Sequence, residues 1–144
     1  MTYTSEQFDE DFDLADELDF VCNEFYNTSY EVAARVCNGL GPSWFPEYLR
    51  NLLDRMNPTL RPVWANHDIG FRNGDGTWGD FIRKNAAFRI NGKLAAKHRY
   101  KWYDPRRYWV MKQAAKFAAE CDVLGWPAYV AAIRDRQKEE EADV

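Results

Sequence analysis

The chain has 144 residues, a formal net charge of −4 and an aromatic content of 16%. This length is typical of one domain, which can bury about two thirds of its unfolded surface without disulfides or metals. We expect neither a membrane span nor a signal peptide, because no stretch nears the ~20 apolar residues of a span and the chain starts with acids. Its three cysteines lack metal-site spacing, so we expect free thiols in a reducing compartment.

Charge is unevenly distributed along the chain. The first 34 residues hold ten acids and no Lys or Arg, whereas residues 83–116 hold eleven Lys or Arg and one acid. Two interpretations are open. The segments either face each other or solvent, or the basic one forms a face for the phosphates of lipid headgroups or nucleic acid.

The N-terminal third predicts two helices. Ser5 is the expected N-cap of the first, whose acids suit a helix start. Spacings of three and four place on one face Phe8, Phe12, Ala15, Leu18, Val21 (or Cys22) and Phe25. The second helix covers residues 30–37 and stops at Asn38–Gly39.

The middle of the chain predicts a loop over 38–49, which is rich in glycine and proline, and, overlapping its end, a short helix over 46–57. A further helix begins at Pro62, a residue favoured in a first turn. A turn over 72–79 follows. Helical spacing resumes at Asp80 and ends near Asn91–Gly92.

The longest predicted helix has Asp104 as its N-cap, Pro105 at its first position and Gly125 as its stop. Its expected core stripe is Tyr108, Met111, Ala115, Ala118 (or Ala119) and Asp122. A last helix starts near Pro127 and frays into a charged tail. Without any β alternation, the predicted fold class is all-α.

Four short motifs, in order between Cys37 and Val130, resemble the phospholipase A2-like proteins of bacteria and bacteriophages. The motifs are "NGLG" from Asn38, "ANHDIGFRNG" around His67, "NAAF" from Asn85, and the pair "YDPRRYWVMKQAAKF" and "LGWPAYV". The resemblance implies a single domain over 1–144. Within it, 1–36 would be an acidic helical extension, 37–133 a phospholipase A2-like helical core and 134–144 a charged tail.

The resemblance also implies a calcium-assisted phospholipid esterase. His67 would be the general base for a water that attacks the sn-2 ester. Asp68 would bind Ca²⁺, together with the loop residues Asn38, Gly39 and Gly41. Asn85, or else Asp80, would orient the other nitrogen of His67.

Four departures from the family pattern bear on activity. Leu40 and Trp64 replace the two cysteines of one family disulfide, as suits a reducing compartment. Phe71 replaces a tyrosine, and Asn85 replaces the aspartate that holds the histidine. An amide does not stabilise an imidazolium as a carboxylate does. We therefore favour a catalytically degenerate protein, a virion component or host-interaction protein, over an active esterase.

Alternative interpretations accompany these residues. Without the motifs, His67 is a structural histidine and Asp68 a surface acid paired with Arg72 at i+4. Either core packing or a binding face accounts for Trp102, Tyr103, Arg106 and Arg107. The partners expected are a phospholipid surface or a virion or host protein, in the host cytoplasm or the virion, and not nucleic acid. The acidic N-terminal helix is either a solvated face or a nucleic-acid mimic that inhibits a host defence protein.

Overall fold

A computed structural model describes residues 3–37 and 58–143, together with 47, 51 and 55. The described part of the chain is all helical and contains no strand, which confirms the predicted fold class. No described helix is both long and apolar enough to cross a membrane. The loop expected over 38–49, including Asn38, Gly39 and Gly41, lies outside the described residues except for residue 47, as does most of the helix expected over 46–57.

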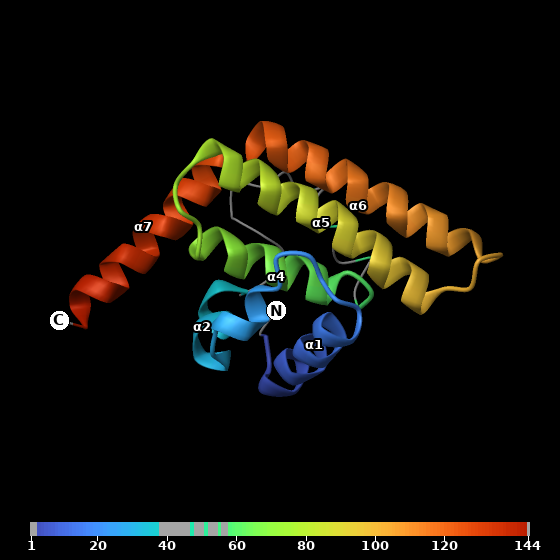
Figure 1. The fold of residues 1–144 in the computed structure, drawn as a ribbon, viewed down its shortest axis with the longest axis horizontal. Coiled ribbons are helices and arrows are strands. Elements are labelled where there is room, and N and C mark those ends of the chain that lie inside the picture. The colour runs from blue at the N-terminus through green and yellow to red at the C-terminus, as the bar shows by residue number, and fades with distance from the viewer. Residues whose placement is uncertain (1–2, 38–46, 48–50, 52–54, 56–57, 144) are drawn as a thin grey trace.

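Helix α4 (Arg61–Arg72) lies at the centre of the fold (Figure 1). It packs against α1 (Ser5–Glu17), η1 (Glu24–Asn27) and α2 (Tyr30–Val36) on one side, and against α5 (Trp78–Arg99) and α7 (Trp126–Ala142) elsewhere. Its residues from Pro62 to Phe71 are buried, apart from the half-buried Asp68. The acidic N-terminal segment is therefore part of the packed structure around α4.

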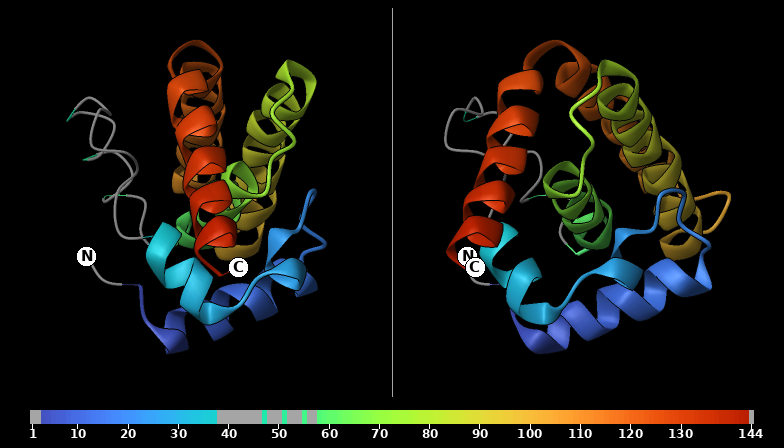
Figure 2. Two further views of the ribbon diagram at one scale, coloured as in Figure 1. Left: turned by 90° about the vertical axis from the view of Figure 1, so that its left-hand side faces the viewer. Right: turned by 60° about the vertical axis from the view of Figure 1, so that its left-hand side comes forward.

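Helices α5 and α6 (Pro105–Leu124) form an antiparallel hairpin along one side of the molecule (Figures 1 and 2). The helices approach closely at Gly92, where a Cβ atom would lie 2.4 Å from the Cβ of Ala114. Real Cβ atoms do not approach so closely, so this crossing requires glycine. The prediction that a helix ends near Asn91–Gly92 is wrong, because Gly92 serves packing and α5 continues to Arg99.

The first helix is shorter than its apolar spacing predicts. It is capped by Thr4 instead of Ser5, through a capping box with Gln7, and it ends at Glu17. The chain then turns through positive φ angles at Asp19 (53°) and Cys22 (51°). This strained turn leaves Val21 exposed and buries Phe20, contrary to the predicted stripe.

Two buried amide side chains stabilise that turn. Asn91 accepts from the Val21 backbone N–H at 2.8 Å and donates to the Val21 carbonyl at 2.9 Å. Asn66 accepts from the backbone N–H of Glu24 at 2.7 Å and donates to the Cys22 carbonyl at 3.0 Å. Each amide satisfies backbone groups that would otherwise be buried without partners, which costs about 1–3 kcal/mol apiece.

The ends of α6 are where the sequence predicts them. Asp104 caps its first turn, Pro105 is its first residue and Gly125 follows its last. Its predicted core stripe is confirmed only in part, since Ala118 is buried and Met111 packs against the core, but Tyr108 is exposed. The other buried residues of α6 are Val110, Ala114, Phe117 and Cys121. The tail expected to fray stays helical in α7 as far as Ala142.

Candidate functional site: a buried histidine and its amide partner

His67 lies on α4 with its side chain enclosed by aromatic rings. Only 6% of the residue is exposed. The imidazole centroid lies 4.2 Å from that of Phe71, 5.4 Å from Phe88 and 6.2 Å from Phe117. These rings come from α4, α5 and α6, so three helices together isolate the imidazole from water.

Asn85 on α5 is the hydrogen-bond partner of the imidazole. Its Oδ1 atom lies 2.8 Å from Nε2 of His67, and its Nδ2 atom donates to Oδ1 of Asp122 at 2.9 Å. A carboxylate only accepts, so the amide nitrogen must face Asp122 and the amide oxygen must face the histidine. His67 therefore carries its proton on Nε2 when neutral, and Nδ1 keeps the lone pair.

The surroundings of His67 keep it neutral. Burial lowers its pKa from 6.5 to about 4, against the opposing effect of the hydrogen bond to Asn85, and the charge of Lys84 lowers it further. An amide oxygen carries no full charge to offset the desolvation of an imidazolium. The imidazole can accept a hydrogen bond at neutral pH but is a weak proton acceptor.

Asp122 was not among the site residues that the sequence indicated. The sequence predicts Asp122 only as a member of the core stripe of α6, whereas it lies half-buried at the end of the hydrogen-bond chain that starts at His67. The position of this carboxylate in an otherwise apolar predicted stripe indicates a polar partner in the core, because a buried carboxylate needs a hydrogen-bond donor.

Asp68 follows His67 but is turned away from it, since adjacent helix residues point about 100° apart. Burial raises the pKa of its carboxyl to about 8. The i+4 pair with Arg72 is not formed, because Arg72 binds Glu139 of α7 instead. Among the described residues Asp68 has no hydrogen-bond or ion-pair partner, and burial alone accounts for the raised pKa of its carboxyl.

The chain approaches α4 just before the glycine loop. The thiol of Cys37 donates to the carbonyl of Ala65 at 3.7 Å, and burial and the nearby Asp68 raise the pKa of that thiol. The next residues, Asn38, Gly39 and Gly41, are outside the described part. Within the described residues, no group of three or more His, Cys, Asp or Glu side chains could hold a metal ion.

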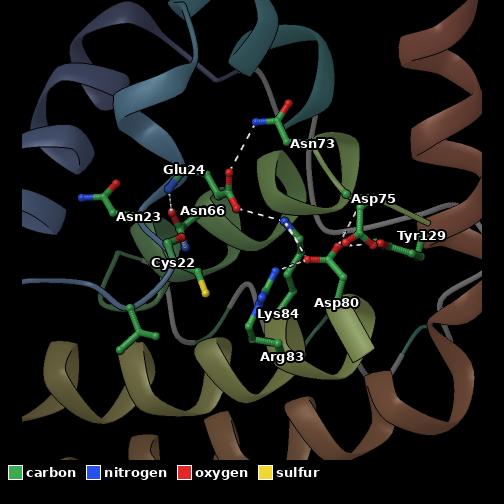
Figure 3. A network of polar contacts seen from close by, with 12 residues as sticks. Cys22, Asn23, Glu24, Asn66, Asn73, Asp75, Asp80, Arg83, Lys84 and Tyr129 are labelled. Atoms are coloured by element: carbon green, nitrogen blue, oxygen red, sulfur yellow. Dashed lines mark hydrogen bonds and ion pairs between the residues drawn. The ribbon is translucent and has the colours of Figure 1, made fainter. Parts of the chain in front are cut away.

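Asp80 does not reach the histidine. Its Oδ2 atom accepts from the hydroxyl of Tyr129 at 2.5 Å and from the backbone N–H of Asp75 at 3.3 Å, while Arg83 binds its other oxygen (Figure 3). The Tyr129 hydroxyl also accepts from the backbone N–H of Gly76 at 2.9 Å. Asp80 thus fastens α7 and the 73–77 turn to the start of α5, and Asn85 is the residue that orients His67.

Lys84 extends this network towards the N-terminal segment. Its Nζ atom lies 3.0 Å from Oε1 of Glu24 and 3.7 Å from Oδ1 of Asp80, and Asn73 donates to Glu24 at 3.4 Å (Figure 3). Among the described residues, this is the one ion pair between the acids of residues 3–34 and the bases of residues 83–116. The charged side chains of the two segments therefore mostly face solvent, while their apolar residues pack in the core.

The remaining predicted binding residues lie at the far end of the hairpin. Trp102 and Tyr103 form the loop between α5 and α6 and are exposed, so core packing is ruled out for them. Arg106 and Arg107 lie on the first turn of α6, where Arg106 binds Asp104 and lies over the ring of Tyr100 at 4.9 Å. The structure thus brings together His67 and Asn85, and it places this second group of residues on another surface.

Comparison of the chain with protein-family models, with curated proteins and with solved structures gives no match in any of the three.

Proposed function

We propose that this protein is a catalytically degenerate, phospholipase A2-like protein that works by binding, as a virion component or a host-interaction protein. The observation that carries the proposal is the hydrogen bond between Nε2 of His67 and the amide of Asn85. A general base must hold a proton during the reaction, and the group beside it must stabilise the resulting cation. Here that group is uncharged.

Two further observations support a site without catalysis. Phe71 packs its ring against His67 at 4.2 Å and against Tyr129 at 5.2 Å, so it adds apolar surface and no hydroxyl. Asp122 binds Asn85 and not the imidazole, so the amide of Asn85 stands between this carboxylate and the histidine. Both features favour a neutral, fixed histidine that helps to join α4, α5 and α6.

The test is a calcium-dependent lipolysis assay with a fluorogenic phospholipid. We expect the wild-type protein to release no more product than His67→Ala in the presence of Ca²⁺. Calcium-dependent turnover by the wild type that His67→Ala abolishes would overturn the proposal. Because a lack of turnover is the expected result, the assay also needs a variant of this protein that is expected to be active.

The double variant Asn85→Asp/Asp122→Asn serves this purpose. It exchanges the two side chains, so net charge and both hydrogen bonds are kept while the histidine gains a carboxylate partner. Adding Phe71→Tyr restores the hydroxyl of the family pattern. Activity in this triple variant, absent when His67 is also replaced, would support loss of catalysis through these positions.

An active calcium-dependent esterase is the second candidate, and a specific observation favours it. Nδ1 of His67 keeps a lone pair because Asn85 fixes the tautomer, and Asp68 is a half-buried carboxyl without a partner among the described residues. The Asp68 carboxyl suits Ca²⁺, which binds oxygen ligands, and Asn38, Gly39 and Gly41 would supply others. A bound Ca²⁺ would polarise the ester carbonyl.

Thermal unfolding distinguishes this candidate without any activity measurement. If Asp68 binds Ca²⁺, adding the ion raises the unfolding temperature of the wild type, and EDTA reverses the rise. Asp68→Asn would remove the effect, while the exposed Asp13→Asn on α1 would retain it. An unfolding temperature that calcium leaves unchanged would count against the second candidate and agree with the first.

A further inference from the structure

The loop between α5 and α6 exposes several large aromatic side chains. Trp102 is 73% exposed and Tyr103 is 62% exposed, and Tyr108 and Trp109 on the first turns of α6 are also exposed. We call these four residues the hairpin tip, and the loop between α5 and α6 lies at one end of the molecule (Figure 1). Clustered exposed rings of this kind mark interaction surfaces, whereas single exposed apolar residues are normal.

The hairpin tip has a defined conformation. The backbone N–H of Asp104 donates to the Lys101 carbonyl at 2.9 Å, and the hydroxyl of Tyr108 donates to the Trp102 carbonyl at 2.5 Å. The Asp104 carboxylate caps α6 and binds Arg106. The loop backbone is thus held at both ends, so the rings are presented to solvent at little entropic cost on binding.

Positive charge surrounds these rings. Lys97 and Arg99 are exposed at the end of α5, Lys101 is exposed in the loop, and Lys112 is exposed on α6. The one acid between residues 83 and 116 is Asp104, which is already engaged by Arg106. The acidic α1 lies on the other side of α4 (Figures 1 and 2). The molecule therefore presents opposite charges on opposite sides of its central helix.

We infer that the hairpin tip docks on an anionic lipid surface. Tryptophan and tyrosine side chains favour the headgroup level of a bilayer, because their rings are apolar while their N–H or O–H groups can contact water. Lysines and arginines beside them bind lipid phosphates. The acidic α1 lies across α4 from the hairpin (Figures 1 and 2), so its charges are not part of the hairpin tip. The inference rests on the proposed function, since it names the partner of a protein that binds without catalysis.

The ring geometry favours lipid over single-stranded nucleic acid. Trp102 and Tyr103 meet edge to face, at an interplanar angle of 86° with their centroids 5.6 Å apart. Successive bases stack on open ring faces along a charged groove. A projecting tip with two perpendicular rings offers no such track, whereas insertion among headgroups requires only exposed amphipathic edges.

Vesicle co-sedimentation tests the inference. The full chain is mixed, in EDTA, with vesicles of phosphatidylcholine alone or of phosphatidylcholine with phosphatidylserine. We expect binding to the anionic vesicles, weaker binding to the neutral ones, and loss of binding as salt is raised. Trp102→Ala should weaken binding about tenfold, as loss of one buried aromatic side chain predicts. Lys101→Gln should weaken it about fivefold.

Matched variants separate the hairpin tip from general surface effects. Trp78 is 57% exposed at the opposite end of α5, so Trp78→Ala removes a comparable ring elsewhere and should leave binding unchanged. Lys138→Gln on α7 is the control for charge. Because Trp102 and Lys101 are exposed, circular dichroism should confirm that all four variants fold.

Three outcomes would overturn the inference. These are no binding to either vesicle, binding that Trp102→Ala and Lys101→Gln leave intact, and binding of a single-stranded oligonucleotide that these variants abolish while vesicles stay unbound. Because EDTA suppresses calcium-dependent turnover, sedimentation reports docking alone. A failure of the proposed function would appear instead as lipolysis in the separate calcium assay.

Discussion

Nε2 of His67 and Oδ1 of Asn85 lie 2.8 Å apart, and the amide nitrogen of Asn85 is bound in turn by Asp122. The carboxylate fixes the amide orientation, and the amide fixes the imidazole tautomer. The histidine is therefore held in one chemical form by a group it does not touch.

Exchanging the two side chains that hold the histidine should raise its pKa. In Asn85→Asp/Asp122→Asn, a carboxylate accepts from Nε2 of His67 and stabilises the imidazolium directly. We expect the histidine to titrate above its wild-type pKa of about 4. NMR titration of the imidazole signals measures this, with the exposed His98 as the internal reference. An unchanged titration would mean that burial alone sets the pKa.

Asp68→Asn should stabilise the protein increasingly as the pH rises. Burial raises the pKa of the Asp68 carboxyl from 3.8 to about 8. Its contribution to stability is therefore fully present below pH 3.8 and is lost as the pH rises through about 8. The amide mimics the protonated acid, so we expect a gain of about 1–3 kcal/mol at pH 7 and none near pH 4.

Urea unfolding at several pH values, without calcium, measures this difference. Asp13→Asn on the exposed face of α1 is the control and should show no gain that grows with pH. His67 contributes with the opposite sign, since its lowered pKa gives stability that is present above 6.5 and lost as the pH falls to about 4. Between about pH 4 and 6.5 the two contributions oppose each other, so the free energy of unfolding of the wild type should change little with pH. In Asp68→Asn only the His67 contribution remains, so the free energy of unfolding should rise with pH over this range.

Gly92→Ala should destabilise the hairpin. The added Cβ would lie 2.4 Å from the Cβ of Ala114, so α5 and α6 would have to separate. We expect a loss of about 1–3 kcal/mol, typical of overpacking. Gly79→Ala in the first turn of α5 is the matched control. Its Cβ would meet nothing within 4 Å, and helix propensity predicts a gain of about 0.5–1 kcal/mol. Thermal unfolding of both variants compares them, and equal effects would contradict the packing argument.

Tyr129→Phe should loosen α7. The buried hydroxyl donates to Asp80 and accepts from Gly76, and burial raises the pKa of Tyr129 to about 12. Its removal leaves Asp80 and the Gly76 N–H short of a partner, at a cost of about 1–3 kcal/mol. Tyr103→Phe on the exposed hairpin tip should be neutral. Chemical denaturation reports both values, and a neutral Tyr129→Phe would show that water replaces the hydroxyl.

Helix ends could be predicted from the sequence where capping residues and prolines next to them determine the ends. Asp104, Pro105 and Gly125 bound α6 through capping and proline geometry, which depend only on neighbouring residues. The ends of α1 and α5 were misplaced because Asn91 and Gly92 act across the fold, one on the Val21 backbone and the other on α6. A sequence pattern does not reveal such distant partners.

In the candidate site, too, some partners could be predicted from the sequence and others could not. Asn85 was expected beside His67 from a resemblance between motifs, and the two are hydrogen-bonded. Asp122 was missed because its partner lies on another helix, and Asp80 was misassigned because Tyr129 is a better-placed partner from α7. Pairing across helices follows from how they pack, and the spacing within each helix constrains it only weakly.

The enclosure of α4 by both halves of the chain has a consequence for cooperativity. A helix whose residues are buried on nearly every side is shielded from solvent, so its backbone amides open to exchange only when the surrounding elements separate. The N-terminal and C-terminal halves should therefore unfold in one transition. Deleting residues 3–36 would expose the apolar side chains of α4 that these residues cover. The remaining chain would then aggregate and would not fold as an independent domain.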